Sequence, residues 1–131
     1  MKQKCVVALA LPDEIVARLK ARYDVVAWAG PEAMSQAKLI DALNGAQGLL
    51  CALSTRLTAE MMDHAPELRV ISTISVGVDH IDIAAATRRG IPVGHTPGVL
   101  VDSTADLAVA LMLATTRRVA EADQWVREGQ W

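Results

Sequence analysis

Short apolar runs alternate with amphipathic stretches along the first hundred residues, and this alternation constrains the fold more than any other feature of the chain. Segments with apolar residues at helical spacing separate the runs, an order typical of βα units around a parallel sheet. The sequence therefore predicts an α/β fold: a flavodoxin-like parallel sheet of about five strands flanked by helices. Fully apolar strands favour a sheet covered on both faces. The expected strands are Cys5–Leu11, Asp24–Trp28, Gly48–Leu53, Val70–Thr73 and Pro92–Gly94.

Residues with a preference for helix ends mark the helices between these strands. Ser35, Thr58 and Asp82 each precede an apolar periodic segment, the position at which their side chains cap a helix. Gly45 and Gly90 follow such segments, where glycine commonly ends a helix in the left-handed conformation. These signals place helices after the second, third and fourth expected strands.

The segment after Gly98 has a different pattern. A helix is expected to begin at Ser103, with Asp106 three residues later, and to run to Arg118. Its middle, Leu107–Ala114, is apolar all the way round, so the helix must be buried on every side. One small sheet covers only one face. We therefore expect a second domain or a second copy of the chain to cover the other, with a homodimer or other self-association through residues 103–118.

Composition and charge exclude several function classes. The chain has 131 residues, of which 52% are hydrophobic and 21% charged, and its net charge is −2. Its basic residues are scattered, so no nucleic-acid partner is expected. The apolar run Cys5–Leu11 reads as a strand rather than a signal peptide. Because the longest apolar stretch, Leu107–Ala114, is far short of a bilayer span, the sequence predicts a cytoplasmic protein with no membrane partner.

The loop after the fourth expected strand is the best candidate for a binding site. Ligands of open α/β folds bind at the carboxyl edge of the sheet, where this loop lies. Gly77 permits a turn that presents successive N–H groups outward, and such a nest holds an anion such as a carboxylate. A plain turn is the alternative. Asp79 and Asp82 are interpreted as residues that cap and brace the next helix, and His80 as a loop residue rather than a general base.

Several motifs are missing from the 131 residues. The chain has no G-x-G-x-x-G dinucleotide loop, no P-loop and no G-x-S-x-G or H-E-x-x-H motif. No histidine, cysteine and aspartate spacing is typical of a metal site, so no metal is assigned. Arg56, after the third expected strand, is a further candidate for contact with an acidic substrate.

Three segments carry a resemblance to a known family. Residues Val70–Asp82, Arg88–Val93 and Thr96–Ala108 resemble the D-2-hydroxy-acid dehydrogenases, and most of all the glyoxylate and hydroxypyruvate reductases. The resemblance implies an NAD(P)-dependent oxidoreductase that reduces small 2-oxo acids to D-2-hydroxy acids in a cleft between two domains. It implies a substrate-binding domain over residues 1–98. Residues 99–131 would then form a hinge helix and the start of the connection to an absent NAD(P)-binding domain.

The resemblance also implies roles for particular residues. The backbone N–H groups of Val76 and Gly77 are expected to hold the substrate carboxylate, and Leu53 and Ser54 to line the other side of that pocket. At the start of the hinge helix, Leu100 and Thr104 are expected to lie near the cofactor.

The resemblance also implies that the catalytic groups lie outside this sequence. In the family, the catalytic arginine, glutamate and histidine come after the position that corresponds to Trp131, so no catalytic residue is assigned. This chain alone is expected to be inactive, and NADP or NAD to bind only the complete enzyme. The alternative is a free-standing, non-catalytic flavodoxin-like module that binds a small carboxylate.

Overall fold

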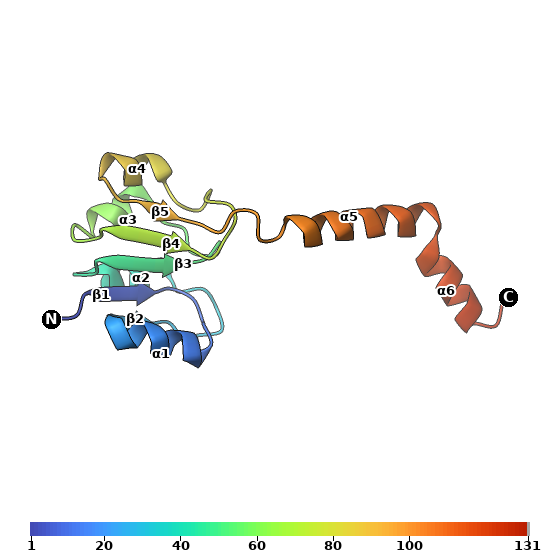
Figure 1. The fold of residues 1–131 in the computed structure, drawn as a ribbon, viewed down its shortest axis with the longest axis horizontal. Coiled ribbons are helices and arrows are strands. Elements are labelled where there is room, and N and C mark those ends of the chain that lie inside the picture. Colours follow the sequence, from blue (N-terminus) through green and yellow to red (C-terminus); the bar gives the residue numbers. More distant parts are fainter. Residues whose placement is uncertain (131) are drawn as a thin grey trace. The chain divides into compact units, whose positions relative to one another are not determined.

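The computed structural model describes residues 1–130 and divides into two units, Met1–Pro97 and a second that begins at Gly98. The first unit contains a parallel sheet with strand order β2-β1-β3-β4-β5 (Figure 1). This is the strand order of flavodoxin-like folds, so the predicted fold class is confirmed. The strands are β1 (Lys4–Val7), β2 (Asp24–Ala27), β3 (Gly48–Cys51), β4 (Val70–Thr73) and β5 (Val93–Gly94).

Four helices accompany the sheet, and the capping residues predicted for the three that follow the second, third and fourth strands are confirmed. The side chains of Ser35, Thr58 and Asp82 each accept the backbone N–H three residues later, at 3.4, 3.3 and 2.8 Å. Gly45 and Gly90 have φ angles of 70° and 67°, the left-handed conformation expected after a helix. The helices are α1 (Asp13–Arg22), α2 (Gln36–Leu43), α3 (Ala59–Asp63) and α4 (Ile83–Arg88).

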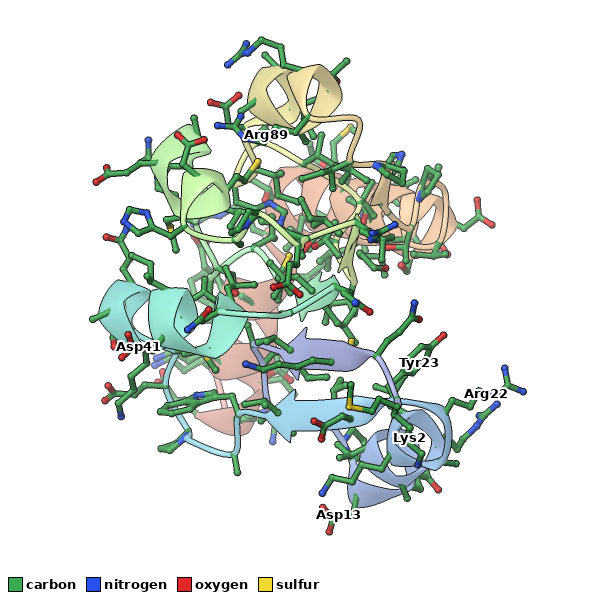
Figure 2. All side chains as sticks on the ribbon, turned by 90° about the vertical axis from the view of Figure 1, so that its left-hand side faces the viewer. Lys2, Asp13, Arg22, Tyr23, Asp41 and Arg89 are labelled. Carbon is green, nitrogen blue, oxygen red and sulfur yellow. The ribbon has the colours of Figure 1, made fainter. Side chains whose placement is uncertain are left out.

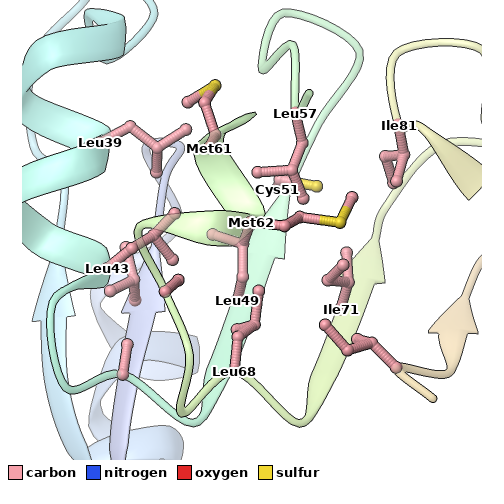
Figure 3. Packing of buried hydrophobic residues seen from close by; sticks show 14 of the residues in the cluster. Leu39, Leu43, Leu49, Cys51, Leu57, Met61, Met62, Leu68, Ile71 and Ile81 are labelled. Carbon is pink, nitrogen blue, oxygen red and sulfur yellow. The ribbon is translucent and has the colours of Figure 1, made fainter. Parts of the chain in front are cut away.

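The hydrophobic core lies between the sheet and the helices on one of its faces. Figure 3 shows Leu39 and Leu43 of α2, and Met61 and Met62 of α3, packed against apolar side chains of β3 and β4. Arg89 joins α3 to α4: its guanidinium donates to the carbonyl of Ala59 at 3.3 Å and pairs with Asp63 (Figure 2). The buried apolar packing and the Arg89 contacts together join α2, α3 and α4 into one layer on this face of the sheet.

The opposite face of the sheet is less covered than the sequence predicts. Helix α1 lies on the other side of the sheet from α2 and has no buried residue (Figure 2). In β4, Ile71 and Thr73 are buried whereas Val70 and Ser72 are exposed. A groove of about 440 Å³ opens here along the first residues of β1, β3 and β4. Within the described residues this face is therefore covered only in part, whereas the sequence predicts that both faces are covered.

The ends of several strands also differ from the prediction. The first strand ends at Val7 rather than Leu11, and the third at Cys51 rather than Leu53. Val7 pairs with Ala27 in β2 and with Leu50 in β3, and pairing stops there. The apolar run of the sequence therefore continues past the last paired residue of the strand. Residue type alone does not mark where strand pairing ends.

The second unit contains two helices, α5 (Val101–Thr116) and α6 (Val119–Arg127). The predicted start at Ser103 is wrong, because its hydroxyl donates to the carbonyl of Leu100 at 3.2 Å instead of capping an N–H group. Helix α6 was not predicted; Arg118, with φ of 51°, separates it from α5. Within residues 1–130, no side chain of α5 is buried, so the second unit does not itself supply the burial expected for this helix. Within residues 1–130, no helix is long and apolar enough to cross a membrane.

Replacing Ile71 by alanine is expected to destabilise the first unit by about 2–5 kcal/mol, because it leaves a cavity in a packed core. Ile71 is fully buried, and its neighbour Val70 on the opposite face is 45% exposed. Val70→Ala is therefore the matched control, with an expected loss of about 1 kcal/mol or less. Urea unfolding measures both; equal losses would contradict the assignment of the core to one face.

Candidate functional site

The loops that follow β3 and β4 leave the sheet side by side at its carboxyl edge. Cys51 and Thr73, the last residues of these strands, are paired in register. The backbone N–H of Leu57 donates to the carbonyl of His80 at 2.8 Å, and that of Asp82 donates to Leu57 at 2.9 Å. These bonds form an isolated parallel bridge that holds the two loops together. The structure thus brings the loop with Leu53 and the loop with Gly77 to one edge.

The loop after β4 presents a run of unpaired backbone donors. Within residues 1–130, the N–H groups from Val76 to His80 have no acceptor. On either side, the N–H of Ser75 donates to the hydroxyl of Thr73 and that of Ile81 to the carbonyl of Val78. Backbone donors without protein partners must be satisfied by water or by a ligand. Consecutive N–H groups of this kind are able to bind an anion.

Gly77 is present for a different reason than the sequence indicates. Its φ lies outside the left-handed region, in which Gly45, Gly90, Gly98 and Gly129 are found. A Cβ built at Gly77 meets only an oxygen of Asp79, at 3.4 Å, which is an ordinary contact. The interpretation of Gly77 as the residue that permits the turn is therefore wrong. Glycine at this position instead leaves free the room next to Asp79 that a Cβ would occupy.

The base of the loop is held by a small hydrogen-bond network. The hydroxyl of Thr73 donates to that of Ser75 at 3.1 Å and accepts the Ser75 N–H at 3.3 Å. Its remaining lone pair accepts from Nε2 of His80 at 3.1 Å. This leaves Nδ1 of His80 as the bare nitrogen, which is buried without a partner within the described residues. The network supports the prediction that His80 is a structural loop residue.

The pKa of His80 lies below its ordinary value of 6.5, because burial disfavours the charged imidazole; the carboxylate of Asp79 partly offsets this effect. Unfolding frees the ring, so the unfolded chain binds the proton more strongly. The free energy of unfolding is therefore expected to fall as the pH drops through 6.5, the ordinary pKa of histidine. His80→Gln should show a smaller fall in the same urea titrations. An unchanged pH dependence would contradict this.

The carbonyl side of the same loop is bound by the segment after β5. Thr96 donates from its hydroxyl to Ile74 at 3.0 Å and from its backbone N–H to Ser75 at 3.1 Å. Nδ1 of His95 lies 2.8 Å from the carbonyl oxygen of Val76. Sequence analysis missed both residues, because no local pattern links positions about twenty residues apart.

The other predicted site residues are exposed. Leu53 is 65% exposed, and Ser54 lies beside it after β3. Arg56 is exposed at the same edge and makes no ion pair with any residue from 1 to 130. In the second unit, the N–H of Thr104 donates to the carbonyl of Leu100 at 3.0 Å in the first turn of α5. The hydroxyl of Thr104 and the apolar side chain of Leu100 are too few groups to bind a dinucleotide by themselves.

The part of the chain that the structure describes offers no metal site: no group of three histidine, cysteine, aspartate or glutamate side chains is placed to hold an ion. The two cysteines are free thiols. Burial raises the pKa of Cys51 to about 11, with the neighbouring Thr73 side chain acting in the opposite direction. At neutral pH this thiol is therefore almost entirely protonated and a poor nucleophile.

Comparison with known proteins assigns the family. The family described as D-isomer specific 2-hydroxyacid dehydrogenase, catalytic domain, matches residues 5–127. The chain belongs to this family. The resemblance inferred from its motifs is thereby confirmed, and the match extends over nearly all of both units.

Individual members of the family agree with this. A glyoxylate reductase of Thermofilum pendens is 47% identical over 99% of this chain, which corresponds to 39% of the relative. The crystal structure of the TT0316 protein of Thermus thermophilus has a TM-score of 0.81 and 44% identity over 98% of this chain and 42% of its own. An NADPH-dependent glyoxylate/hydroxypyruvate reductase of Sinorhizobium meliloti, in complex with NADP and malonate, has a TM-score of 0.72 and 27% identity. It is matched over all of this chain and 40% of its own. The chain spans about two fifths of the length of the curated relatives it matches.

Proposed function

We propose that the loop edge of the first unit binds the carboxylate of a small 2-oxo acid. In this proposal the chain is the substrate-binding part of an NAD(P)-dependent oxidoreductase that reduces glyoxylate or hydroxypyruvate to the D-2-hydroxy acid. The observation that carries it is the run of N–H groups from Val76 to His80, at the carboxyl edge of the sheet, that have no acceptor among the described residues. Family membership supports the reaction class. So do the names of the relatives, a glyoxylate reductase from Thermofilum pendens and a glyoxylate/hydroxypyruvate reductase from Sinorhizobium meliloti.

Each predicted site residue has a role in this proposal. The N–H groups of Val76 and Gly77 donate to the two carboxylate oxygens, a charge-assisted pair of hydrogen bonds stronger than neutral ones. Leu53 supplies an apolar wall and Ser54 a hydroxyl on the neighbouring loop. No side-chain cation is required, because the backbone dipoles provide the positive potential.

The domain assignment is part of the same proposal. Residues 1–98 would form the substrate-binding domain, and residues 99–131 a hinge helix with the start of a connection; Trp131 lies outside the described residues. Thr104 and Leu100, at the start of that helix, would lie near the cofactor. The cytoplasmic location expected from the sequence stays a prediction.

The 131-residue chain by itself is expected to reduce glyoxylate no faster than buffer does with NADPH or NADH. It contains no G-x-G-x-x-G loop, and no residue of it is assigned to proton transfer. The loss of absorbance of the reduced nicotinamide measures this. Turnover that survives further purification would contradict the assignment of the catalytic groups to another part of the enzyme.

Titration of the ¹⁵N-labelled chain with sodium glyoxylate tests the proposed binding site. We expect the amide resonances of Val76 and Gly77 to shift first, because their N–H groups receive the carboxylate. The methyl ester of glyoxylate is the matched control ligand, since it keeps the carbonyl groups and loses the charge. Equal shifts with the ester, or shifts confined to other residues, would reject a carboxylate site at this loop.

A further inference from the structure

We propose that His95, assisted by the Thr96 backbone, is a positioning residue that orients the N–H groups of Val76 and Gly77 towards the substrate carboxylate. The proposal rests on the proposed function above, and it assigns a role to a side chain that does not itself touch the substrate. It depends on hydrogen bonds to the opposite side of the same peptide groups.

The segment after β5 binds three consecutive carbonyl groups of the loop. The hydroxyl of Thr96 donates to Ile74 at 3.0 Å, and the backbone N–H of Thr96 donates to Ser75 at 3.1 Å. Nδ1 of His95 donates to Val76 at 2.8 Å. Each carbonyl in this stretch therefore has a donor supplied by the same two residues.

These bonds set the direction of the proposed anion donors. A trans peptide group is planar, and its C=O and N–H bonds point in opposite directions; the chain has no cis peptide within the described residues. The carbonyl of Ser75 shares its peptide group with the N–H of Val76, and the carbonyl of Val76 shares one with the N–H of Gly77. Thr96 thus fixes the first donor, and His95 fixes the second.

The third bond of the segment has a separate consequence. The carbonyl of Ile74, bound by the Thr96 hydroxyl, shares its peptide group with the N–H of Ser75. That N–H already donates to the hydroxyl of Thr73 at 3.3 Å and is not available to a ligand. Removing the Thr96 hydroxyl therefore removes a hydrogen bond from the same segment without releasing either proposed donor.

The bond from His95 determines which of its nitrogens carries a proton. A carbonyl oxygen only accepts, so Nδ1 must be the N–H nitrogen. This condition is met by the neutral Nδ1–H tautomer and by the imidazolium ion. An asparagine side chain places its Nδ2 donor at a similar distance from the backbone as Nδ1 of histidine. His95→Asn is therefore expected to keep the bond, and His95→Ala to lose it.

The rest of the loop does not hold these peptide groups in place, so the hydrogen bonds from His95 and Thr96 are needed to orient them. Between β4 and α4 the chain has no regular secondary structure, and its donors from Val76 to His80 make no bonds of their own within the described residues. A free peptide group rotates about its flanking φ and ψ angles. Holding its carbonyl pre-orients the N–H, so less ordering remains for the ligand to impose.

Two NMR measurements on the 131-residue chain test the proposal. The first is the order parameter of the Gly77 N–H from ¹⁵N relaxation without any anion. We expect a rigid value, about 0.85, in the wild type and in His95→Asn, and a value below about 0.6 in His95→Ala. The second is the glyoxylate titration, in which His95→Ala should bind about three- to tenfold more weakly, the loss expected for one exposed hydrogen bond. Thr96→Val, which removes one hydrogen bond from the same segment, should lose clearly less than His95→Ala in both readouts. The matched control is His64→Ala: Nδ1 of His64 lies 2.8 Å from the carbonyl oxygen of Glu60, away from the loop, and this variant should leave both readouts unchanged.

The outcomes separate this proposal from the proposed function. If the wild type binds glyoxylate at Gly77 and His95→Ala binds equally well with a rigid Gly77 N–H, the positioning role is overturned and the carboxylate site stands. If the wild type does not bind glyoxylate, the proposed function fails. The order parameter then still decides whether His95 orients the peptide group. Equal losses in Thr96→Val and His95→Ala would also overturn the proposal, because they would indicate general loosening of the segment.

Discussion

Replacing Gly77 by alanine is expected to weaken glyoxylate binding by at least about tenfold while leaving the fold intact. The new methyl group would stand next to the N–H proposed to receive the carboxylate, and displacing a ligand from a hydrogen bond of this kind costs about 1.5–3 kcal/mol. Glyoxylate titration of the variant, followed by NMR, measures the effect on binding.

The Gly77→Ala variant is expected to be as stable as the wild type. Because φ of Gly77 lies outside the left-handed region, alanine adopts the same backbone without strain. The only atom near its Cβ is an oxygen of Asp79 at 3.4 Å. A compatible glycine-to-alanine change is neutral or stabilises a protein by about 0.4–1 kcal/mol, since it restricts the unfolded chain. Urea unfolding should therefore show no loss.

Gly48→Ala is the matched control. A Cβ at Gly48 meets the sulfur of Cys5, also at 3.4 Å, and its φ is likewise outside the left-handed region. Gly48 begins β3, at the opposite edge of the sheet from the loop. This variant should bind glyoxylate as the wild type does. Wild-type affinity in Gly77→Ala would mean that the loop does not receive the carboxylate.

The isolated chain is expected to self-associate through α5, as the sequence predicts. Leu107 and Leu111 are 59% and 58% exposed and lie one helical turn apart. Large exposed apolar surfaces are rare on monomeric proteins and mark surfaces that another surface covers. Sedimentation velocity should show dimers or larger species in the wild type. The double variant Leu107→Glu, Leu111→Glu should shift them almost completely to monomer.

The control variant introduces two glutamates on α1 instead of α5. Ala17 and Ala21 are exposed on α1 at the same four-residue spacing. Ala17→Glu with Ala21→Glu adds equal charge without removing apolar surface from α5, and it should leave the association unchanged. A wild-type chain that stays monomeric at all accessible concentrations would show that α5 needs no partner.

Local patterns were sufficient to predict much of the first unit. The side chains of Ser35, Thr58 and Asp82 cap helices, and Gly90 ends one, because capping is decided within four residues of the chain. The fourth strand, Val70–Thr73, was predicted at its observed bounds. The family could also be inferred from sequence, because its motifs are contiguous.

The candidate site depends on contacts that no local pattern records. His95 and Val76 are 19 residues apart in sequence, and their hydrogen bond forms because β5 lies beside β4 in the sheet. The reason for glycine at position 77 was also misjudged, because its φ is set by the surrounding loop and not by the residue type.

The sequence by itself determined the order of strands and helices in the first unit, the caps of three of its helices and the family, since periodicity, capping and motifs act between near neighbours. Only the tertiary structure decided where pairing stops in β1 and β3 and which face of the sheet is covered. It also decided which loop donors stay unpaired, and that a second helix, α6, follows Arg118. These features depend on neighbours that are distant along the chain, and a residue's own chemistry does not specify which of them it will meet.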